Sequence, residues 1–214
     1  MKYYPVNLDL RERRCVVVGG GQVAERKTLS LLEAGADVTV VSPSLTPKLA
    51  DLAASGKVLP VPALFQESHL ANAHLAIAAT NDLAVNRAVA QFCRTKGILV
   101  NVVAPPEESS FIVPSVVERG DLVIAISTSG TSPALSRSIR QELEKQYGPE
   151  YELLLTRLAG VRKRLREDVG SEQSRRLVLE AIIGSGVLEL LREGKQHEAD
   201  HLINELLRQH ARPS

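Results

Sequence analysis

The feature that most constrains the fold is a glycine-rich stretch near the start of the chain. The ten residues from Cys15 read CVVVGGGQVA, so a β-branched run gives way to glycines and then to a helical pattern. Gly19, Gly21 and Ala24 occupy the three small positions of a G-x-G-x-x-A fingerprint. Those positions serve a tight turn, close backbone approach to a pyrophosphate, and helix–strand packing. The stretch therefore predicts a strand, turn and helix that bind a dinucleotide.

The expected cofactor site continues beyond the fingerprint. The backbone amides of Gln22 and Val23 open the next helix and are expected to face the phosphates. The second strand of a Rossmann unit usually ends in an acidic residue that binds the ribose, but here Ser42, Pro43 and Ser44 follow it. A serine hydroxyl is left to contact a ribose or a 2′-phosphate, so this segment does not select NAD or NADP.

Composition sets the class of protein. Of 214 residues, 44% are hydrophobic and 24% charged, which is ordinary for a globular protein. The formal net charge of +1 gives no reason to expect a nucleic-acid or membrane partner. Cys15 and Cys93 lack C-x-x-C spacing, which favours two buried thiols over a disulfide or metal site. The N-terminus lacks a secretory pattern and no run approaches ~20 apolar residues, so a cytoplasmic protein is expected.

The pattern along the first half alternates between strands and helices. Polar residues stand where two of the strands end: Thr80 and Asn81 follow one strand, and Asn101 lies near the end of the next. Because a sheet of this kind binds its ligand beyond the carboxyl ends of the strands, we expect these residues at the cofactor site. Asp82 is interpreted as a helix cap rather than a catalytic acid. The expected elements after the glycines are a helix ending at Gly35, strands at 37–41, 57–61, 74–79 and 98–103, helices at 46–55 and 82–96, and a helical turn at 67–71. An edge strand over 3–10 is expected before them.

The pattern then becomes antiparallel. Residues 109–118 and 121–128 read as a hairpin, which indicates that another structural unit begins near residue 113. A hydroxyl-rich loop then enters a helix over 134–145, with Ser132 as N-cap and Pro133 in its first turn. Capping alone explains this loop, and so does an anion site. The residues of that anion site would be Ser127, Thr128, Ser129, Thr131, Ser132, Arg137 and Arg140.

Residues 149–210 are helical in pattern throughout. A basic run over 162–166 lacks aromatic residues and is followed by Glu167 and Asp168, which favours a solvated helix face over an RNA-binding patch. The histidines show no metal-ligand spacing, and the pair His197 and His201 also reads as a solvated helix face. No metal site is expected.

Three segments in this order carry a resemblance to a known family: VVVGGGQVAERK, LAIAATND and NVVAPPEESSFIVPSVVERGDLVIAISTSGTSPALSR. With them the chain resembles the precorrin-2 dehydrogenase family, including the amino-terminal part of siroheme synthases, over about residues 1–145. The resemblance implies oxidation of precorrin-2 to sirohydrochlorin with NAD, in an intertwined homodimer. It also implies an α/β fold with a Rossmann-type parallel sheet (1–112), a small α+β dimerisation region (113–148) and a helical C-terminal domain (149–214).

One position departs from the family. The resemblance places an acid/base aspartate after Asn101-Val-Val, and this chain has Ala104 there. An alanine transfers no proton and binds no metal. Either a nearby carboxylate (Asp82, Glu107 or Glu108) serves, or water suffices, or activity is impaired. The alternatives to a dehydrogenase are therefore a bifunctional dehydrogenase and ferrochelatase, a non-catalytic nucleotide- or tetrapyrrole-binding homologue, and a generic Rossmann ligand sensor.

Overall fold

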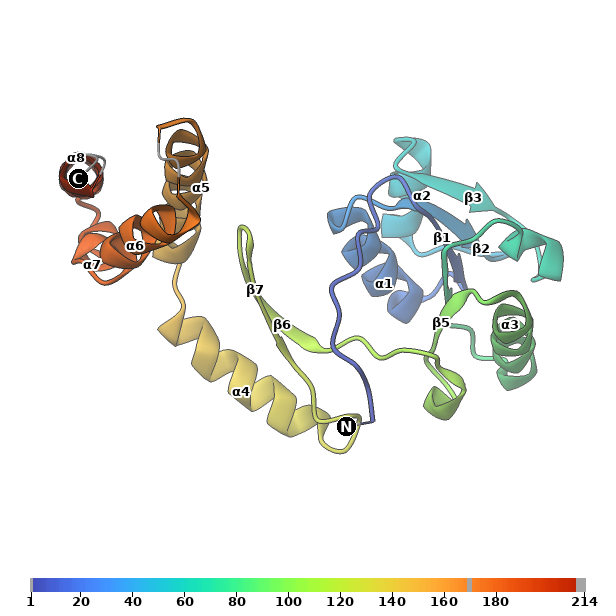
Figure 1. Cartoon of the computed structure of the whole chain (residues 1–214). Helices are drawn as coiled ribbons and strands as arrows, with labels where there is room; N and C mark the ends of the chain where they lie inside the picture. Colours follow the sequence, from blue (N-terminus) through green and yellow to red (C-terminus); the bar gives the residue numbers. More distant parts are fainter. Residues whose placement is uncertain (1, 169–170, 211–214) are drawn as a thin grey trace. The chain divides into compact units, whose positions relative to one another are not determined.

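A computed structural model of the chain describes residues 2–168 and 171–210. It divides into two compact units (Figure 1), the first ending at Val113 and the second beginning at Pro114. Each unit is described by itself. Within the described residues, no helix combines the length and the apolar character needed to cross a bilayer.

The first unit is built on a five-stranded parallel sheet. Its strands lie in the order β3-β2-β1-β4-β5. Successive strands are added on one side of β1 up to β3 and on the other side from β4 onward, so the strand order reverses between β1 and β4. This order makes the carboxyl ends of β1 and β4 the switch point at which open α/β sheets bind ligands. The strands are β1 (Arg14–Val18), β2 (Asp37–Val41), β3 (Val58–Val61), β4 (Leu75–Ala78) and β5 (Leu99–Val102).

Helices cover both faces of this sheet. Cys15 and Val17 of β1 pack with α1 (Gln22–Glu33) and α2 (Pro47–Ala54) in one core. Val16 and Val18 face the other core, which contains α3 (Leu83–Lys96) and the 3₁₀ turn η1 (Glu67–Leu70). Because both faces are buried, the strands are apolar runs rather than alternating sequences. The predicted βαβ unit and helical turn are confirmed.

Serine hydroxyls bond the outer edge of β5. The Ser110 hydroxyl accepts from the backbone amide of Val100 at 2.8 Å, and the Ser109 hydroxyl accepts from that of Val102 at 2.8 Å. The Ser110 amide in turn donates to the Val100 carbonyl at 2.8 Å. The outer side of β5, the edge strand, thus has hydrogen-bond partners without a sixth strand. The two serines come just after the 3₁₀ turn η2 (Pro106–Glu108).

The edge strand expected over residues 3–10 does not form, and that prediction is wrong. Residues 2–10 contain no strand, and the side chains of Tyr4 and Val6 are 84% and 62% exposed. Two features explain this. Pro5 brings no amide hydrogen to a ladder, and the free edge of β5 is already bonded by the serines. Only Leu10 reaches the core of the sheet.

The second unit begins with the predicted hairpin. Strands β6 (Ser115–Arg119) and β7 (Leu122–Ile126) pair antiparallel around Gly120, and α4 (Pro133–Gln146) lies against them. The first strand starts at Ser115 rather than at 109, because the two serines before it bond β5. Val117 is the hairpin side chain that is fully buried among those described.

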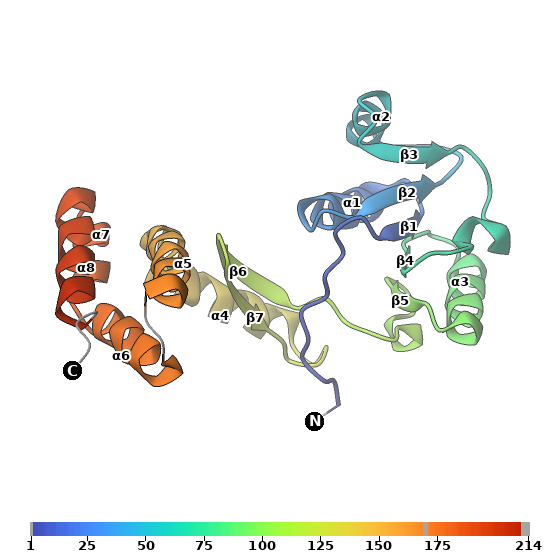
Figure 2. The same cartoon turned by 45° about the horizontal axis from the view of Figure 1, so that its top comes forward.

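Within the part of the chain that the structure describes, four further helices follow α4. The helices α5 to α8 share one leucine-rich core, and α7 and α8 lie against each other (Figure 2). The break at Gly184-Ser185-Gly186 separates α6 from α7. Their bounds are α5 (Glu150–Asp168), α6 (Glu172–Ile183), α7 (Val187–Arg192) and α8 (Gln196–His210). The boundary expected between 148 and 149 falls between α4 and α5 and remains a proposal.

Candidate functional site

The glycine turn joins β1 to α1 at the switch point. Gly19 has φ +125°, and a Cβ added there would overlap the carbonyl oxygen of Ala79 after β4. A side chain is therefore excluded both by backbone conformation and by space. The Gly19 amide donates to the Val41 carbonyl at the end of β2 at 2.9 Å. The turn is thus held between the ends of the two strands that flank β1.

The next two glycines have different surroundings. A Cβ on Gly20 would overlap the Ser44 carbonyl oxygen, whereas a Cβ on Gly21 would meet no atom within 4 Å. Gly21 is the N-cap of α1, and no side chain among those described caps this helix end. The first-turn amides, including those of Gln22 and Val23, are therefore free for an anion. Ala24 is fully buried against the sheet.

The loop after β2 is held down on this turn. The Ser42 hydroxyl is buried and donates to the Ser44 carbonyl at 2.7 Å, which closes the loop around the exposed Pro43. The Thr46 amide donates to the Gly20 carbonyl at 3.0 Å, and the Thr46 hydroxyl donates to Glu25 at 2.6 Å. Among the two candidate serines, Ser44 is the one whose side chain is exposed. The requirement for glycine at position 20 was not inferred from the sequence.

The loop after β4 lies beside the glycine turn. Asn81 is exposed, and the Thr80 hydroxyl lies 2.8 Å from Asn86 Oδ1 and 3.0 Å from the Asp82 carbonyl oxygen. A hydroxyl has one proton, so it donates to one of these acceptors at a time. Asp82 accepts from the amides of Ala84 and Val85, as an N-cap does, so the capping interpretation is confirmed.

The end of β5 contributes buried polar contacts. Asn101 is 9% exposed, and its Nδ2 donates to the Phe111 carbonyl at 3.2 Å. Ala104 lies two residues beyond the strand, where its carbonyl accepts from Asn86 Nδ2 at 2.8 Å. Of the carboxylates near it in sequence, Glu108 pairs with Arg94 at 2.8 Å and Glu107 is exposed. Asn101 thus fastens the chain beyond β5.

The sheet brings most of the predicted cofactor residues to the carboxyl end of its strands. The turn at Gly19–Val23 and the pair Thr80–Asn81 follow the neighbouring strands β1 and β4, and Asn101 is on the adjacent β5. The loop at Ser42–Ser44 follows β2, on the other side of β1. Asn86 joins this group and was not inferred from sequence. The signal was present, since an asparagine stands on the helix face that also carries Val89, Ala90 and Cys93.

The hydroxyl-rich loop of the second unit is organised around Thr128. Its hydroxyl accepts from the Ser132 amide at 3.0 Å and lies 3.2 Å from the buried Ser136 hydroxyl. Ser127 accepts from the amide of Ser129, which has φ +54°. Ser132 caps α4 through the Leu135 amide at 3.3 Å, so the predicted cap is confirmed. Thr128 and Ser132 therefore hold the loop, while Ser127, Ser129 and Thr131 are exposed.

The two arginines of α4 differ. Arg140 forms an ion pair with Glu144 one turn later. Arg137 is exposed and lines a hollow of about 580 Å³, together with Ser115 and Ser138. Pro133, Ala134 and Gln141 complete the lining. Of the two predicted anion-binding cations, Arg137 is therefore the one that is available to a ligand.

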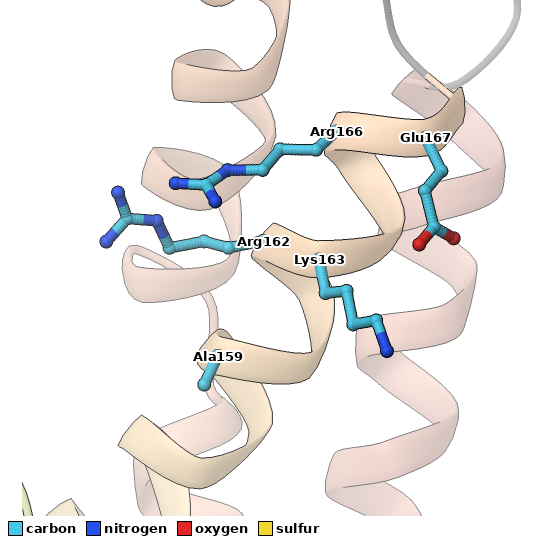
Figure 3. A pocket seen from close by; sticks show the side chains of 5 residues that line it. All are labelled: Ala159, Arg162, Lys163, Arg166 and Glu167. Carbon is cyan, nitrogen blue, oxygen red and sulfur yellow. The ribbon is translucent and has the colours of Figure 1, made fainter.

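A basic surface lies on the C-terminal half of α5. Arg162 and Arg166 point the same way from the helix, while Lys163 and Glu167 lie on another side of it (Figure 3). With Ala159 they line an open hollow of about 360 Å³. All five are exposed, in keeping with the solvated face favoured from the sequence.

Both cysteines are free and buried. Burial raises the pKa of the Cys15 thiol to about 11, and the charge of Asp37 adds to the effect; burial alone raises that of Cys93 to about 11. Both thiols are therefore protonated and unreactive near neutral pH. Over the described residues, no three side chains from histidine, cysteine, aspartate and glutamate gather as a metal site.

Comparison with known proteins places this arrangement in a family. A family model described as putative NAD(P)-binding matches residues 6–115, and one described as sirohaem biosynthesis protein central matches residues 119–146. The solved structure of SirC, precorrin-2 dehydrogenase, has a TM-score of 0.79 and 31% identity, covering 95% of this chain and 100% of that chain. This chain belongs to the precorrin-2 dehydrogenase and siroheme synthase family. The resemblance drawn from the three sequence segments is confirmed.

Curated members of the precorrin-2 dehydrogenase and siroheme synthase family are longer. The siroheme synthase of Methylobacillus flagellatus is 39% identical over 207 residues, and that of Nitrosomonas europaea is 38% identical over 208 residues. Each alignment covers 97% of this chain and 44% of the relative, so the chain spans under half the length of these proteins. Family membership supports a nicotinamide dinucleotide as the cofactor.

Proposed function

We propose that the protein oxidises precorrin-2 to sirohydrochlorin with NAD as hydride acceptor. The observation that carries the proposal is the turn at Gly19–Gly21. It presents open space and uncapped helix amides at the switch point of a chain that matches a precorrin-2 dehydrogenase over that protein's whole length. In the balanced reaction, precorrin-2 gives up a hydride and a proton, and sirohydrochlorin, NADH and H⁺ are formed.

The chain's own residues fit the dinucleotide. The amides of Gln22 and Val23 would bind the pyrophosphate, and the loop at Ser42–Ser44 would contact the adenosine ribose. The nicotinamide supplies the hydride acceptor when bound, and the loop at Thr80–Asn81 would border it. We take NAD rather than NADP as the acceptor because the Glu25 carboxylate, which accepts from the Thr46 hydroxyl just after the loop at Ser42–Ser44, would repel a 2′-phosphate bound there.

The family's aspartate is replaced by Ala104 in this chain, so no side chain at that position can accept the proton that precorrin-2 loses. Asp82 caps α3, and Glu108 is held by Arg94. We assign the proton to water, because hydride transfer depends on orientation of the cofactor and substrate more than on a protein base. Glu107, the third nearby carboxylate, is exposed. We therefore favour the second of the three alternatives left open by the sequence, in which water suffices.

The second unit would bind the carboxylates of the macrocycle. Arg137 is an exposed cation that lines a hollow of about 580 Å³. The loop before α4 adds the exposed residues Ser127, Ser129 and Thr131. Arginine binds carboxylates through paired hydrogen bonds, so a polycarboxylate suits this surface.

Exposed apolar side chains of the same unit support the proposal of a homodimer. The side chains of Val116, Val123 and Leu135 are 38%, 47% and 51% exposed on a two-stranded hairpin and its helix. A second copy packed on this hairpin and helix would bury these side chains. A cytoplasmic setting suits a nicotinamide enzyme with two reduced, buried thiols.

The test is an anaerobic incubation of purified protein with precorrin-2 and NAD, followed by the absorbance of sirohydrochlorin. The proposal expects product with repeated turnover, and less with NADP. Absence of product at high protein concentration, with the fold intact and NADH bound, would contradict it. Added ferrous iron provides a second reading, because siroheme formed faster than the spontaneous rate would identify the bifunctional alternative.

A further inference from the structure

Asn86 is an asparagine buried inside the first unit. Its side chain is 0% exposed, in the second turn of α3, between apolar neighbours such as Val89 and Ala90. A buried amide is costly unless its donors and acceptors are all paired. Something more than helix packing must therefore account for a polar side chain on this face.

All four hydrogen-bonding positions of the Asn86 amide are used. Its Oδ1 accepts from the Thr80 amide at 3.2 Å and faces the Thr80 hydroxyl at 2.8 Å. Its Nδ2 donates to the Thr80 carbonyl at 3.1 Å and to the Ala104 carbonyl at 2.8 Å. An amide with two acceptors and two donors fits this set, whereas a carboxylate has no hydrogen to donate to either carbonyl.

These contacts join two loops at the carboxyl end of the sheet, where the cofactor is proposed to bind. Thr80 lies two residues after β4, and Ala104 lies two residues after the neighbouring β5. In this fold the pyrophosphate lies at the turn after β1 and the adenosine ribose at the end of β2. The loops after β4 and β5 are on the opposite side of β1, so they border the other half of the dinucleotide.

We propose that Asn86 is a positioning residue that sets the spacing of these two loops for the nicotinamide half of the cofactor. The proposal rests on the proposed dinucleotide function. Asn86 acts through Thr80 and the backbone at Ala104 and does not itself touch the cofactor. Its loss would leave the adenosine half of the site intact, because the glycine turn and the loop after β2 make none of these hydrogen bonds.

The test compares binding of NADH with binding of ADP, which lacks the nicotinamide. In Asn86→Asp the carboxylate faces two carbonyl oxygens, so the loops separate. NADH affinity is expected to fall by about tenfold or more and kcat by about 100-fold, the size of effect that a ~1 Å misplacement has on a reaction. ADP affinity is expected to stay within about twofold of the wild type, since the phosphate contacts are those of the α1 amides.

Two further variants keep the test decisive. Thr80→Val removes the hydroxyl that faces Asn86 Oδ1 and that also accepts from the Asp82 amide. NADH affinity should therefore fall in the same direction by about three- to tenfold even if Asn86→Asp fails to fold. Val89→Ala, on the same face of α3, is the matched control. It should lower the melting temperature and leave the affinities for NADH and ADP unchanged.

The outcomes separate this inference from the proposed function. Equal losses of NADH and ADP affinity, or a selective loss of NADH affinity in Val89→Ala as well, would overturn the role of Asn86. Unchanged NADH affinity in folded Asn86→Asp would also overturn it. A selective loss of NADH affinity in the Asn86 and Thr80 variants would support it, even if the wild type failed to oxidise precorrin-2, because the binding measurement does not use that substrate.

Discussion

Gly21 stands at the N-cap of α1 with open space where a side chain would project. Its φ of −84° is accessible to any residue. The backbone therefore does not require glycine at this position, which fits the proposal that a ligand occupies the open space. Gly19 differs, because its positive φ and the carbonyl of Ala79 require glycine for folding.

We expect Gly21→Asp to abolish NADH binding while the protein stays folded. The new carboxylate would stand in the space of the pyrophosphate, and like charges ~4 Å apart near a protein surface repel by about 4 kcal/mol, so affinity should fall by more than about 100-fold. Calorimetric titration with NADH and a thermal melt measure the two effects. Unchanged affinity would place the cofactor elsewhere.

Gly186→Asp is the matched control for that experiment. Gly186 is also a helix N-cap with negative φ and with open space around its Cα, but it starts α7 in the second unit. The same change of charge there should leave NADH affinity as in the wild type. A comparable loss in this variant would mean that the added charge, rather than its place, weakens binding.

The arginines of α4 give a prediction about substrate. Arg137→Gln should raise the KM for precorrin-2 by about 10- to 100-fold, which corresponds to the loss of one hydrogen bond to a charged group. Arg140→Gln should have a smaller effect, because Arg140 is engaged by Glu144. Steady-state kinetics at saturating NAD measure both, and NADH affinity should be unchanged in each. A larger effect of Arg140→Gln would contradict the assignment.

At the scale of elements, the edge of β5 depends on serine hydroxyls rather than on a strand. Ser110→Ala would leave the amide of Val100, which is 2% exposed, without its partner. An unpaired buried donor costs about 1–3 kcal/mol, so the free energy of unfolding should fall by that amount. Urea denaturation measures it, with Ser55→Ala on the outer surface as comparison. A cost below that of Ser55→Ala would contradict this role.

The sequence predicts these elements well where local chemistry determines them. Asp82 and Ser132 precede helices at positions where a side-chain oxygen can bond free amides, and both act as caps. The strand expected over residues 3–10 does not form, because a strand can pair only with a free edge of the sheet. The outer edge of β5 is already bonded by Ser109 and Ser110, about a hundred residues later in the chain. Gly20 was not identified because the atoms that exclude a side chain there belong to Ser42 and Ser44, beyond the next strand. Asn86 was not identified because its bond to the Ala104 carbonyl joins α3 to the loop after β5.

A buried carboxylate links the start of α5 to α7. Glu150 is 7% exposed, and Arg192 donates to it at 3.0 Å. Burial raises the pKa of Glu150, but hydrogen bonds from its own backbone amide and from Arg192 outweigh burial, so the pKa lies below its ordinary value of 4.5. A lowered pKa means that the charged form stabilises the fold fully above that value and progressively less as the pH falls through the folded-state pKa.

Glu150→Gln should therefore lower the stability of the protein near neutral pH. The difference in unfolding free energy between wild type and variant should shrink as the pH falls below 4.5. Urea denaturation of both proteins at a series of pH values gives this difference. A difference that does not change with pH would show that the ion pair with Arg192 does not stabilise the fold.

At the scale of the whole molecule, the chain combines two units with separate cores. The expectation of a dinucleotide site could be drawn from residues alone, since the glycine turn and the alternation of strands and helices follow general rules of α/β folds. The substrate could not be predicted this way. Arg137 and the loop around Thr128 left capping alone and an anion site as alternatives, and only the family resemblance suggests an anionic substrate.

The most direct test of the central claim is a stoichiometric assay of hydride transfer. Wild-type protein, precorrin-2 and NAD should give NADH and sirohydrochlorin in equal amounts. Gly186→Asp should do the same, and Gly21→Asp should give neither product. Sirohydrochlorin formed without an equal amount of NADH, or formed equally well by Gly21→Asp, would contradict the claim that a nicotinamide bound at the glycine turn accepts the hydride.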